Sequence, residues 1–207
     1  MAKHGARRSH LHRDRLGNPK DWKRYLRRLL GPDRARWQRP EKVVRALGLR
    51  PGQSACEIGT GPGYFAFRLA RAVGPGGHVY AVDAEPRMLG LLSARLRRAR
   101  RKNITPVLGL PENPLLPPRA CDLIILVNTY HHFRDGPGYL RRLVRGLRPG
   151  GRIVNIDFHR RPTPAGPPVE HRVAREDFIR DAGRAGLRLA AELGFLPYQY
   201  VLVLRLR

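Results

Sequence analysis

Three glycines at alternate positions, Gly59, Gly61 and Gly63, stand between a short strand candidate (residues 53–58) and a segment with helical spacing (64–73). Glycine adopts positive φ angles without a steric penalty and lets a ligand approach the backbone closely. In an open parallel sheet, ligands bind beyond the carboxyl ends of the strands, where a strand turns into the next helix. The segment therefore predicts an α/β fold with a ligand site at this turn.

The spacing of these glycines distinguishes this loop from dinucleotide-binding loops and from P-loops. A dinucleotide-binding loop has the pattern G-x-G-x-x-G, which would place a glycine at position 64, where the chain has Tyr64. A P-loop would need Gly-Lys-Ser or Gly-Lys-Thr after the turn, and this sequence has neither there. Dinucleotide and P-loop sites are therefore disfavoured.

Strand and helix patterns alternate along the rest of the chain. Strands are expected at 53–58, 78–82, 104–108, 122–127, 152–158, 187–193 and 198–206, and helices at 64–73, 86–100, 139–147 and 175–185. Such alternation predicts an open, doubly wound α/β sheet. Only four residues, 194–197, separate the last two strands, which predicts an antiparallel pair. The proline-rich segments 109–119 and 159–172 are expected to be irregular.

The first 50 residues have a different character. Residues 1–18 are basic and rich in histidine, which predicts a flexible arm. Residues 19–50 are expected to hold two helices, at 21–30 and 40–47, leaving 51–207 as the main domain. The segments around Trp22 and Trp37 would either form a lid over the ligand site or pack on the sheet.

The charge of the chain is strongly positive. It has 41 Lys and Arg against 16 Asp and Glu, a formal net charge of +25, and 36 of the basic residues are Arg. Such a field attracts polyanions. The arginine excess also matches the codon bias of a GC-rich genome, so a selected nucleic-acid surface and a compositional origin both stay open.

Apolar runs and cysteines limit the class of protein further. The longest apolar run, residues 123–127, is far shorter than the roughly 20 residues of a membrane span. No apolar stretch follows the basic start, so a cytoplasmic protein without a secretory signal is expected. Two cysteines, Cys56 and Cys121, leave no disulfide framework and no cysteine-based zinc site.

An acidic residue complements the glycine loop. Asp83 ends the second expected strand, where a carboxylate can accept hydrogen bonds from both hydroxyls of a ribose lying across the strand ends. The glycine turn, the acid at the end of the next strand and the α/β alternation together predict a nucleoside-containing ligand.

These segments resemble the class I S-adenosylmethionine-dependent methyltransferases. Residues 57–63 are similar to the E/D-x-G-x-G-x-G motif, 79–83 to the second-strand motif, 122–126 to the fourth strand and 147–152 to the L-x-P-G-G turn of that family. The resemblance covers about residues 40–207 and is nearest to the small-molecule group that includes ubiquinone and menaquinone methyltransferases. It implies a Rossmann-like, seven-stranded sheet with its last strand antiparallel, and S-adenosylmethionine as the cofactor.

The resemblance also implies which residues contact that cofactor. Its methionine end would lie along Glu57, Gly59, Gly61 and Gly63. Asp83 would hold the ribose, and Ala84 and Glu85 would flank the adenine. Asn128, after the fourth strand, would lie near the reacting centre.

The adenine side departs from the family pattern. Leu110 stands where the family often has an acid for the adenine amino group. The contacts would then come from the backbone around Leu110 and Pro111, or from Glu112 or Asn113.

Several residues near the fourth and fifth strands are candidates for a general base, which would help if the acceptor is a hydroxyl. His131 and His132 follow the fourth strand, while Asp157 and His159 end the fifth. The alternatives are that one histidine packs under the next helix and the other is solvated, and that Asp157 caps a turn. No spacing signature for a metal site is present.

The sequence is thus interpreted as a methyltransferase that moves a methyl group in line from S-adenosylmethionine to a small molecule. An RNA or protein methyltransferase that docks through its basic surface is the first alternative. A basic nucleic-acid-binding module with this fold and no turnover is the second. No Asn/Asp-Pro-Pro-Tyr/Phe motif of base methylation follows the fourth strand, so only non-specific binding to nucleic acid is expected. The oligomeric state stays open.

Overall fold

One seven-stranded sheet organises the chain in the computed structural model, which describes residues 21–207. Its strands lie in the order β3-β2-β1-β4-β5-β7-β6. Their bounds are β1 Ser54–Ile58, β2 His78–Asp83, β3 Ile104–Leu108, β4 Cys121–Val127, β5 Leu147–Phe158, β6 Leu187–Glu192 and β7 Gln199–Leu206. The first five strands pair in parallel, and β7 runs antiparallel to both β5 and β6. The predicted Rossmann-like, doubly wound sheet with an antiparallel last strand is confirmed.

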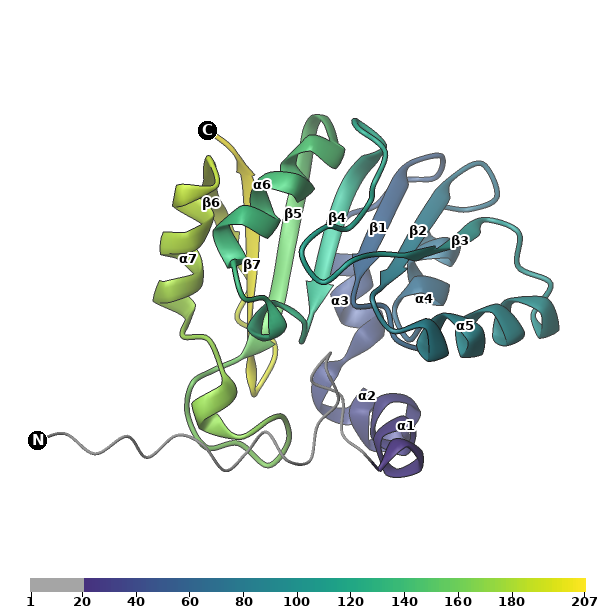
Figure 1. The fold of residues 1–207 in the computed structure, drawn as a ribbon, viewed down its shortest axis with the longest axis horizontal. Coiled ribbons are helices and arrows are strands. Elements are labelled where there is room, and N and C mark those ends of the chain that lie inside the picture. The colour runs from purple at the N-terminus through teal and green to yellow at the C-terminus, as the bar shows by residue number, and fades with distance from the viewer. Residues whose placement is uncertain (1–20) are drawn as a thin grey trace, which may run out of the picture.

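Helices cover both faces of this sheet (Figure 1). One core includes side chains of α3 (Pro40–Ala46), α4 (Ala66–Ala72) and α5 (Pro86–Arg98), and the other includes side chains of α6 (Gly136–Gly146) and α7 (Arg175–Arg184). Along β4, alternate residues belong to alternate cores. This burial on both sides explains why β4 is almost entirely aliphatic.

Two N-terminal helices lie beside the carboxyl ends of the strands (Figure 1). The expected helix at 21–30 is present as α1 (Trp22–Leu30), but a second short helix, α2 (Pro32–Gln38), follows it directly. Gly31 and Pro32 end α1, as expected, yet Pro32 also starts α2. Proline is well suited to a first helical position because its missing N–H would have no partner there and its φ is already helical.

Two boundaries in the second half differ from expectation. Helix α6 begins three residues early, at Gly136, because Asp135 caps it by accepting from the Gly138 N–H at 2.8 Å. Strand β5 begins at Leu147 rather than Arg152, with the expected turn retained as a bulge inside it. Two short 3₁₀ turns, Tyr130–His132 and Val169–His171, were not foreseen.

Other expectations concern the charged arm, the cysteines and the membrane. The basic arm expected at 1–18 lies outside the described residues. Cys56 and Cys121 are free, buried thiols. Among residues 21–207, no helix is both long enough and apolar enough to cross a lipid bilayer.

Candidate functional site

The glycine loop turns sharply between β1 and α4, with φ values of 70° at Gly59, 53° at Gly61 and 85° at Gly63. A Cβ atom on Gly59 would lie 2.4 Å from Thr129 Oγ1. The Thr129 hydroxyl sits there because it donates to the carbonyls of Ile58 and Val127, both at 3.1 Å, and so joins the ends of β1 and β4. Glycine at 59 is therefore required both by the turn and by this close approach.

Asp83 is hydrogen-bonded to the glycine loop. One carboxylate oxygen accepts from the Gly61 N–H at 2.7 Å, and the other accepts from the Glu85 N–H at 2.9 Å. Burial raises the pKa of Asp83, against the lowering effect of these backbone hydrogen bonds. A carboxylate has about four acceptor positions, so Asp83 keeps acceptor capacity beyond its backbone hydrogen bonds.

The expected adenine-contacting residues gather beside Asp83. The Gly109 N–H donates to the Asp83 carbonyl at 3.0 Å, which brings the loop of Leu110 and Pro111 to this end of the site. Leu110 itself is exposed to solvent, at 51 % of its surface. Ala84 follows Asp83 directly, and Glu85 is buried as the N-cap of α5.

Glu85 links this end of the site to α1. Its carboxylate is paired with the Arg87 guanidinium at 2.8 Å, and that guanidinium lies 4.3 Å from the centre of the Trp22 ring. Leu29, also on α1, lies 3.7 Å from where a Gly61 Cβ would be. Helix α1 therefore lies over the glycine loop.

Glu57 is a buried carboxyl at the other end of the loop, only 3 % exposed. It accepts a hydrogen bond from the Thr60 hydroxyl at 2.7 Å. Burial raises the pKa of Glu57 from 4.5 to about 8, although the Thr60 hydrogen bond and the charge of Arg34 both act to lower it. A cation bound beside it would favour the ionised carboxylate.

Helix α2 packs beside Glu57 and was missed by sequence reasoning. Its Arg34 is buried, with the guanidinium 4.1 Å from the centre of the Tyr64 ring. Burial lowers the pKa of Arg34 to about 10, which leaves it charged at neutral pH. Trp37 lies 5.3 Å from the Phe158 ring and 6.3 Å from the Tyr198 ring. Of the two readings for the tryptophan segments, Trp37 therefore packs on the strand ends, whereas α1 covers the loop.

Asn128 follows β4 with a φ of +56°, an uncommon value for a residue other than glycine. Its backbone N–H donates to the Ile156 carbonyl at 2.8 Å, and its side-chain Oδ1 accepts from Gln199 Nε2 at 2.5 Å. Gln199 was not foreseen as a site residue. Its only sequence signal is that it is polar in the otherwise apolar first part of β7.

Two candidate catalytic residues meet at the ends of neighbouring strands. His131 Nδ1 lies 2.9 Å from Asp157 Oδ2 and 3.1 Å from Oδ1. Asp157 is fully buried and also accepts from the Phe158 N–H at 2.8 Å. Because the carboxylate binds Nδ1, the neutral imidazole has its proton on Nδ1 and its lone pair on Nε2.

The remaining candidates are arranged differently. His132 is exposed, with its ring centre 4.3 Å from that of His131. His159 lies 5.8 Å from the Tyr200 ring, and burial lowers its pKa. Tyr200 is buried opposite Asp157 in the β5–β7 register, whereas Tyr198 contacts Trp37. Within residues 21–207, no three His, Cys, Asp or Glu side chains group in a way that could hold a metal ion.

The residues fit the three parts of S-adenosylmethionine. The loop glycines hold the backbone in a turn with positive φ, and a Cβ atom at Gly59 or Gly63 would collide with Thr129 or Leu92. Glu57 would face the cationic end, Asp83 would accept from the ribose, and the exposed Leu110 would lie against the adenine. The residues at the carboxyl edge of the sheet are thus compatible with such a ligand.

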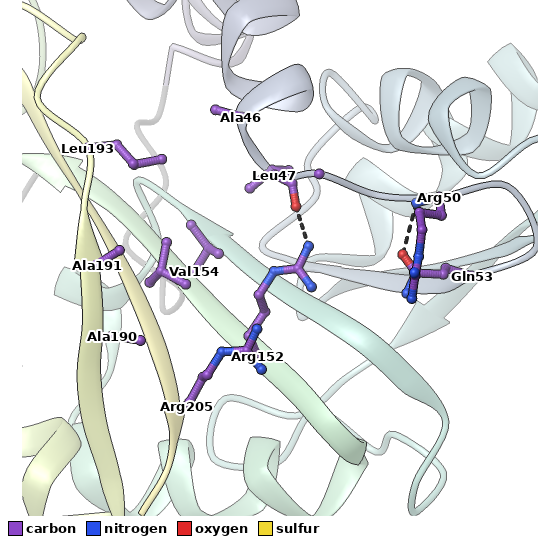
Figure 2. Close-up of a pocket in the computed structure, with 12 residues that line it drawn as sticks. Ala46, Leu47, Arg50, Gln53, Arg152, Val154, Ala190, Ala191, Leu193 and Arg205 are labelled. Atoms are coloured by element: carbon purple, nitrogen blue, oxygen red, sulfur yellow. Dashed lines mark hydrogen bonds between the residues drawn. The ribbon is translucent and has the colours of Figure 1, made fainter.

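Two surface hollows lie away from this edge. The larger, about 540 Å³, lies between the end of α3 and strands β5, β6 and β7, and Figure 2 shows Arg152 donating into it to the Leu47 carbonyl. Burial and the charges of Arg205 and Arg50 lower the pKa of Arg152. The second, about 470 Å³, is lined by Phe67, Ala99, Arg68, Arg71, Arg95, Arg98 and Arg101. Neither hollow includes a glycine-loop residue, and both are strongly basic.

The comparisons with known proteins agree with this geometry. Residues 56–153 match the family described as "Methyltransferase domain". The chain is 35 % identical over 108 residues to a protein-L-isoaspartate O-methyltransferase of Methanothrix thermoacetophila, covering 52 % of this chain and 49 % of that protein. It is 31 % identical over 119 residues to a demethylmenaquinone methyltransferase of Lactococcus lactis, covering 56 % and 46 %.

Among solved structures, the fold is similar to a SAM-dependent methyltransferase from Aquifex aeolicus. The TM-score is 0.84 with 25 % identity, covering 88 % of this chain and 97 % of that one. The chain spans about half the length of the curated relatives given above.

Proposed function

Since the chain is a class I S-adenosylmethionine-dependent methyltransferase by fold, motif and domain match, we propose that it transfers a methyl group in line to a small-molecule acceptor. The observation that carries this proposal is the carboxyl edge of the sheet, which holds both the glycine loop with Asp83 and the His131–Asp157 pair. The groups proposed to hold the donor and the proposed proton acceptor thus lie at the same edge.

Toward the methyl donor, the protein's role is to bind S-adenosylmethionine and to orient it. When bound, S-adenosylmethionine supplies an activated methyl group on a positively charged sulfur. Glu57 would lie at the cationic end and Asp83 would accept from the ribose hydroxyls. Holding donor and acceptor in line can lower the activation barrier by about 7–11 kcal/mol without acid or base catalysis.

In the acceptor half, His131 would act as general base. Asp157 fixes the Nδ1–H of the imidazole, so Nε2 has the lone pair that takes the proton of an acceptor hydroxyl. The buried carboxylate also stabilises the imidazolium that forms. His131 is only 5 % exposed in its side chain, so the proton transfer would take place away from bulk water.

Helices α1 and α2 limit the size of the acceptor in this proposal. They lie over the glycine loop and against the ends of β5 and β7, through Leu29, Arg34 and Trp37. We propose that these helices act as a cover, which favours a small acceptor over a folded protein. The demethylmenaquinone methyltransferase relative agrees with a small acceptor, while the isoaspartate methyltransferase relative keeps a protein acceptor as the rival. The basic hollows would bind nucleic acid non-specifically.

Transfer of radiolabel from S-adenosylmethionine tests the proposal. The full chain is incubated with separate small-molecule, protein and RNA fractions of a bacterial extract, with Asp83→Ala as the matched control. We expect label in the small-molecule fraction only, and little with the variant. Label in protein or RNA alone would overturn the small-molecule acceptor, and no label in any fraction would count against turnover.

A further inference from the structure

Four polar side chains from three separate segments form one hydrogen-bonded chain that joins α2 to the ends of β4 and β7. Arg34 Nε donates to Gln38 Oε1 at 2.5 Å, Gln38 Nε2 donates to Gln199 Oε1 at 3.1 Å, and Gln199 Nε2 donates to Asn128 Oδ1 at 2.5 Å. Gln38 is fully buried and Gln199 is 1 % exposed. We call these residues the amide relay.

The direction of the amide relay is fixed at one end. A guanidinium has only donors, whereas each amide has one accepting and one donating end. Gln38 must therefore turn its oxygen to Arg34 and its nitrogen to Gln199. Gln199 must in turn accept from Gln38 and donate to Asn128. Reversing any one amide would bring two donors or two acceptors together in a buried place, which is costly.

The consequence appears at Asn128. Its oxygen is occupied by Gln199, so its Nδ2, with two N–H donors, is the end that stays available. Among the described residues, none accepts a hydrogen bond from Nδ2. Asn128 is half-buried at the end of β4, in the same turn as His131.

We propose that Asn128 determines acceptor specificity by presenting donors only, and that it selects acceptors with a carbonyl or carboxylate oxygen close to the methylated atom. This inference rests on the proposed function. His131 would take the proton of the nucleophile while the Asn128 amide donates to the neighbouring oxygen. A molecule with an aromatic amine at that place would offer Nδ2 only a weak hydrogen-bond acceptor and would bind less well.

The structure allows the polarity to be inverted without touching Asn128. In Gln38→Glu, both carboxylate oxygens accept, so Gln199 must reverse and present its oxygen to Asn128, which must reverse as well. In Gln199→Glu, the carboxylate at position 199 faces Asn128 directly, so Asn128 must reverse there too. Gln53→Glu is the matched control, because Gln53 accepts from the Arg50 N–H in the hollow of Figure 2, outside the amide relay.

The first readout does not depend on activity. In the ¹⁵N-labelled full chain, the Asn128 side-chain NH₂ signals are identified by their loss in Asn128→Asp. We expect them to shift in Gln38→Glu and Gln199→Glu, where the NH₂ becomes bonded inside the protein, and to stay in place in Gln53→Glu. Unchanged signals in Gln38→Glu would overturn the fixed polarity.

The second readout tests the acceptor class with two neutral probes, 2-hydroxyacetophenone and 2-aminophenol, in the presence of S-adenosylhomocysteine. We expect the wild type to bind the carbonyl probe about tenfold more tightly, the size of one net hydrogen bond, and Gln38→Glu to reverse that ratio. An equal ratio in both proteins, or no binding of either probe, would overturn the acceptor class. Absence of S-adenosylhomocysteine binding would instead refute the proposed function, while the NH₂ signals would still test the amide relay.

Discussion

His131 and Asp157, 26 positions apart in the chain, are joined by a contact of 2.9 Å between Nδ1 and Oδ2. They come together because β4 and β5 are parallel neighbours whose carboxyl ends meet at one edge. The side chains are almost entirely buried, at 5 % and 0 % exposure. Because the buried carboxylate accepts from Nδ1–H, the neutral ring keeps its lone pair on Nε2.

Asp157→Asn tests the role of this pair. The amide NH₂ would donate to Nδ1, which moves the ring proton to Nε2 and removes the lone pair that serves as base. We expect kcat to fall about 10²- to 10⁴-fold, the usual size of a general-base contribution, with S-adenosylhomocysteine affinity nearly unchanged by calorimetry. His132→Asn, at an exposed ring, is the control. Retained kcat in Asp157→Asn would return Asp157 to a structural role.

Glu57 should make stability depend on pH. Its folded-state pKa of about 8 lies above the ordinary 4.5, so the folded state holds a proton that the unfolded state has lost. Its contribution to the free energy of unfolding is therefore complete below about pH 4.5 and is lost as the pH rises toward 8. We expect urea unfolding between pH 5 and 8.5 to show this fall, and Glu57→Gln to show a flatter profile. Parallel profiles would contradict the assignment.

Gly59→Ala should destabilise the fold. Its φ of +70° costs a residue with a Cβ about 1–2 kcal/mol, and the contact with Thr129 adds to this. Thr129→Ala in the same chain should restore part of the loss, so that the double variant unfolds less easily than the sum of the singles predicts. Gly90→Ala is the control, since it has open space in α5 and should gain about 0.5–1 kcal/mol. Strictly additive effects would rule out the contact.

Asp83→Ala should weaken S-adenosylhomocysteine binding by about 1.5–3 kcal/mol, because the ribose hydroxyls and the Gly61 N–H both lose their acceptor. Asp83→Asn should lose less, since one oxygen remains. Asp122→Ala removes a comparable bond to the Ser54 N–H and an ion pair with Arg148, so it should lower stability but not affinity. Calorimetry with equal affinities for wild type and Asp83→Ala would refute the ribose contact.

Non-specific RNA binding should be separable from methyl transfer. The hollow between α4 and α5 places Arg98 and Arg101 at the surface. Replacing either by Gln should reduce the slope of log affinity against log salt by about 1, if each neutralises one phosphate. Methyl transfer should not change when RNA is added. Inhibition of transfer by RNA that disappears in these variants would favour the RNA-methyltransferase alternative.

The sequence predicts the parts of this molecule that local rules control. The glycine turn, the aliphatic β4 and the acid at the end of β2 each follow from neighbouring residues, and all were found where expected. Helix α2 was missed because a Gly-Pro pair that ends one helix was not recognised as the start of another. Its seven residues have little periodicity, and its position depends on Arg34 against Tyr64 and Trp37 against Phe158.

The side-chain network of the site could not be predicted for a different reason. Gln38, Asn128 and Gln199 are hydrogen-bonded across 161 positions of chain, and no local pattern relates them. His131 and Asp157 were each candidates, but their pairing depends on the register of β4 and β5. Sequence reasoning gave the residue types at the carboxyl edge, whereas the fold decides which of them meet.

The place of β7 has a consequence for biogenesis. Strand β6 precedes β7 in the chain but lies beyond it in the sheet, so β6 has no strand to pair with until β7 inserts beside β5. The strand that closes this gap also brings Gln199 to Asn128. A nascent chain that has not yet released residues 199–206 from the ribosome therefore lacks both the pairing of β6 and the hydrogen bond to Asn128. The pairing of β6 and the Gln199–Asn128 hydrogen bond are therefore completed by the same strand.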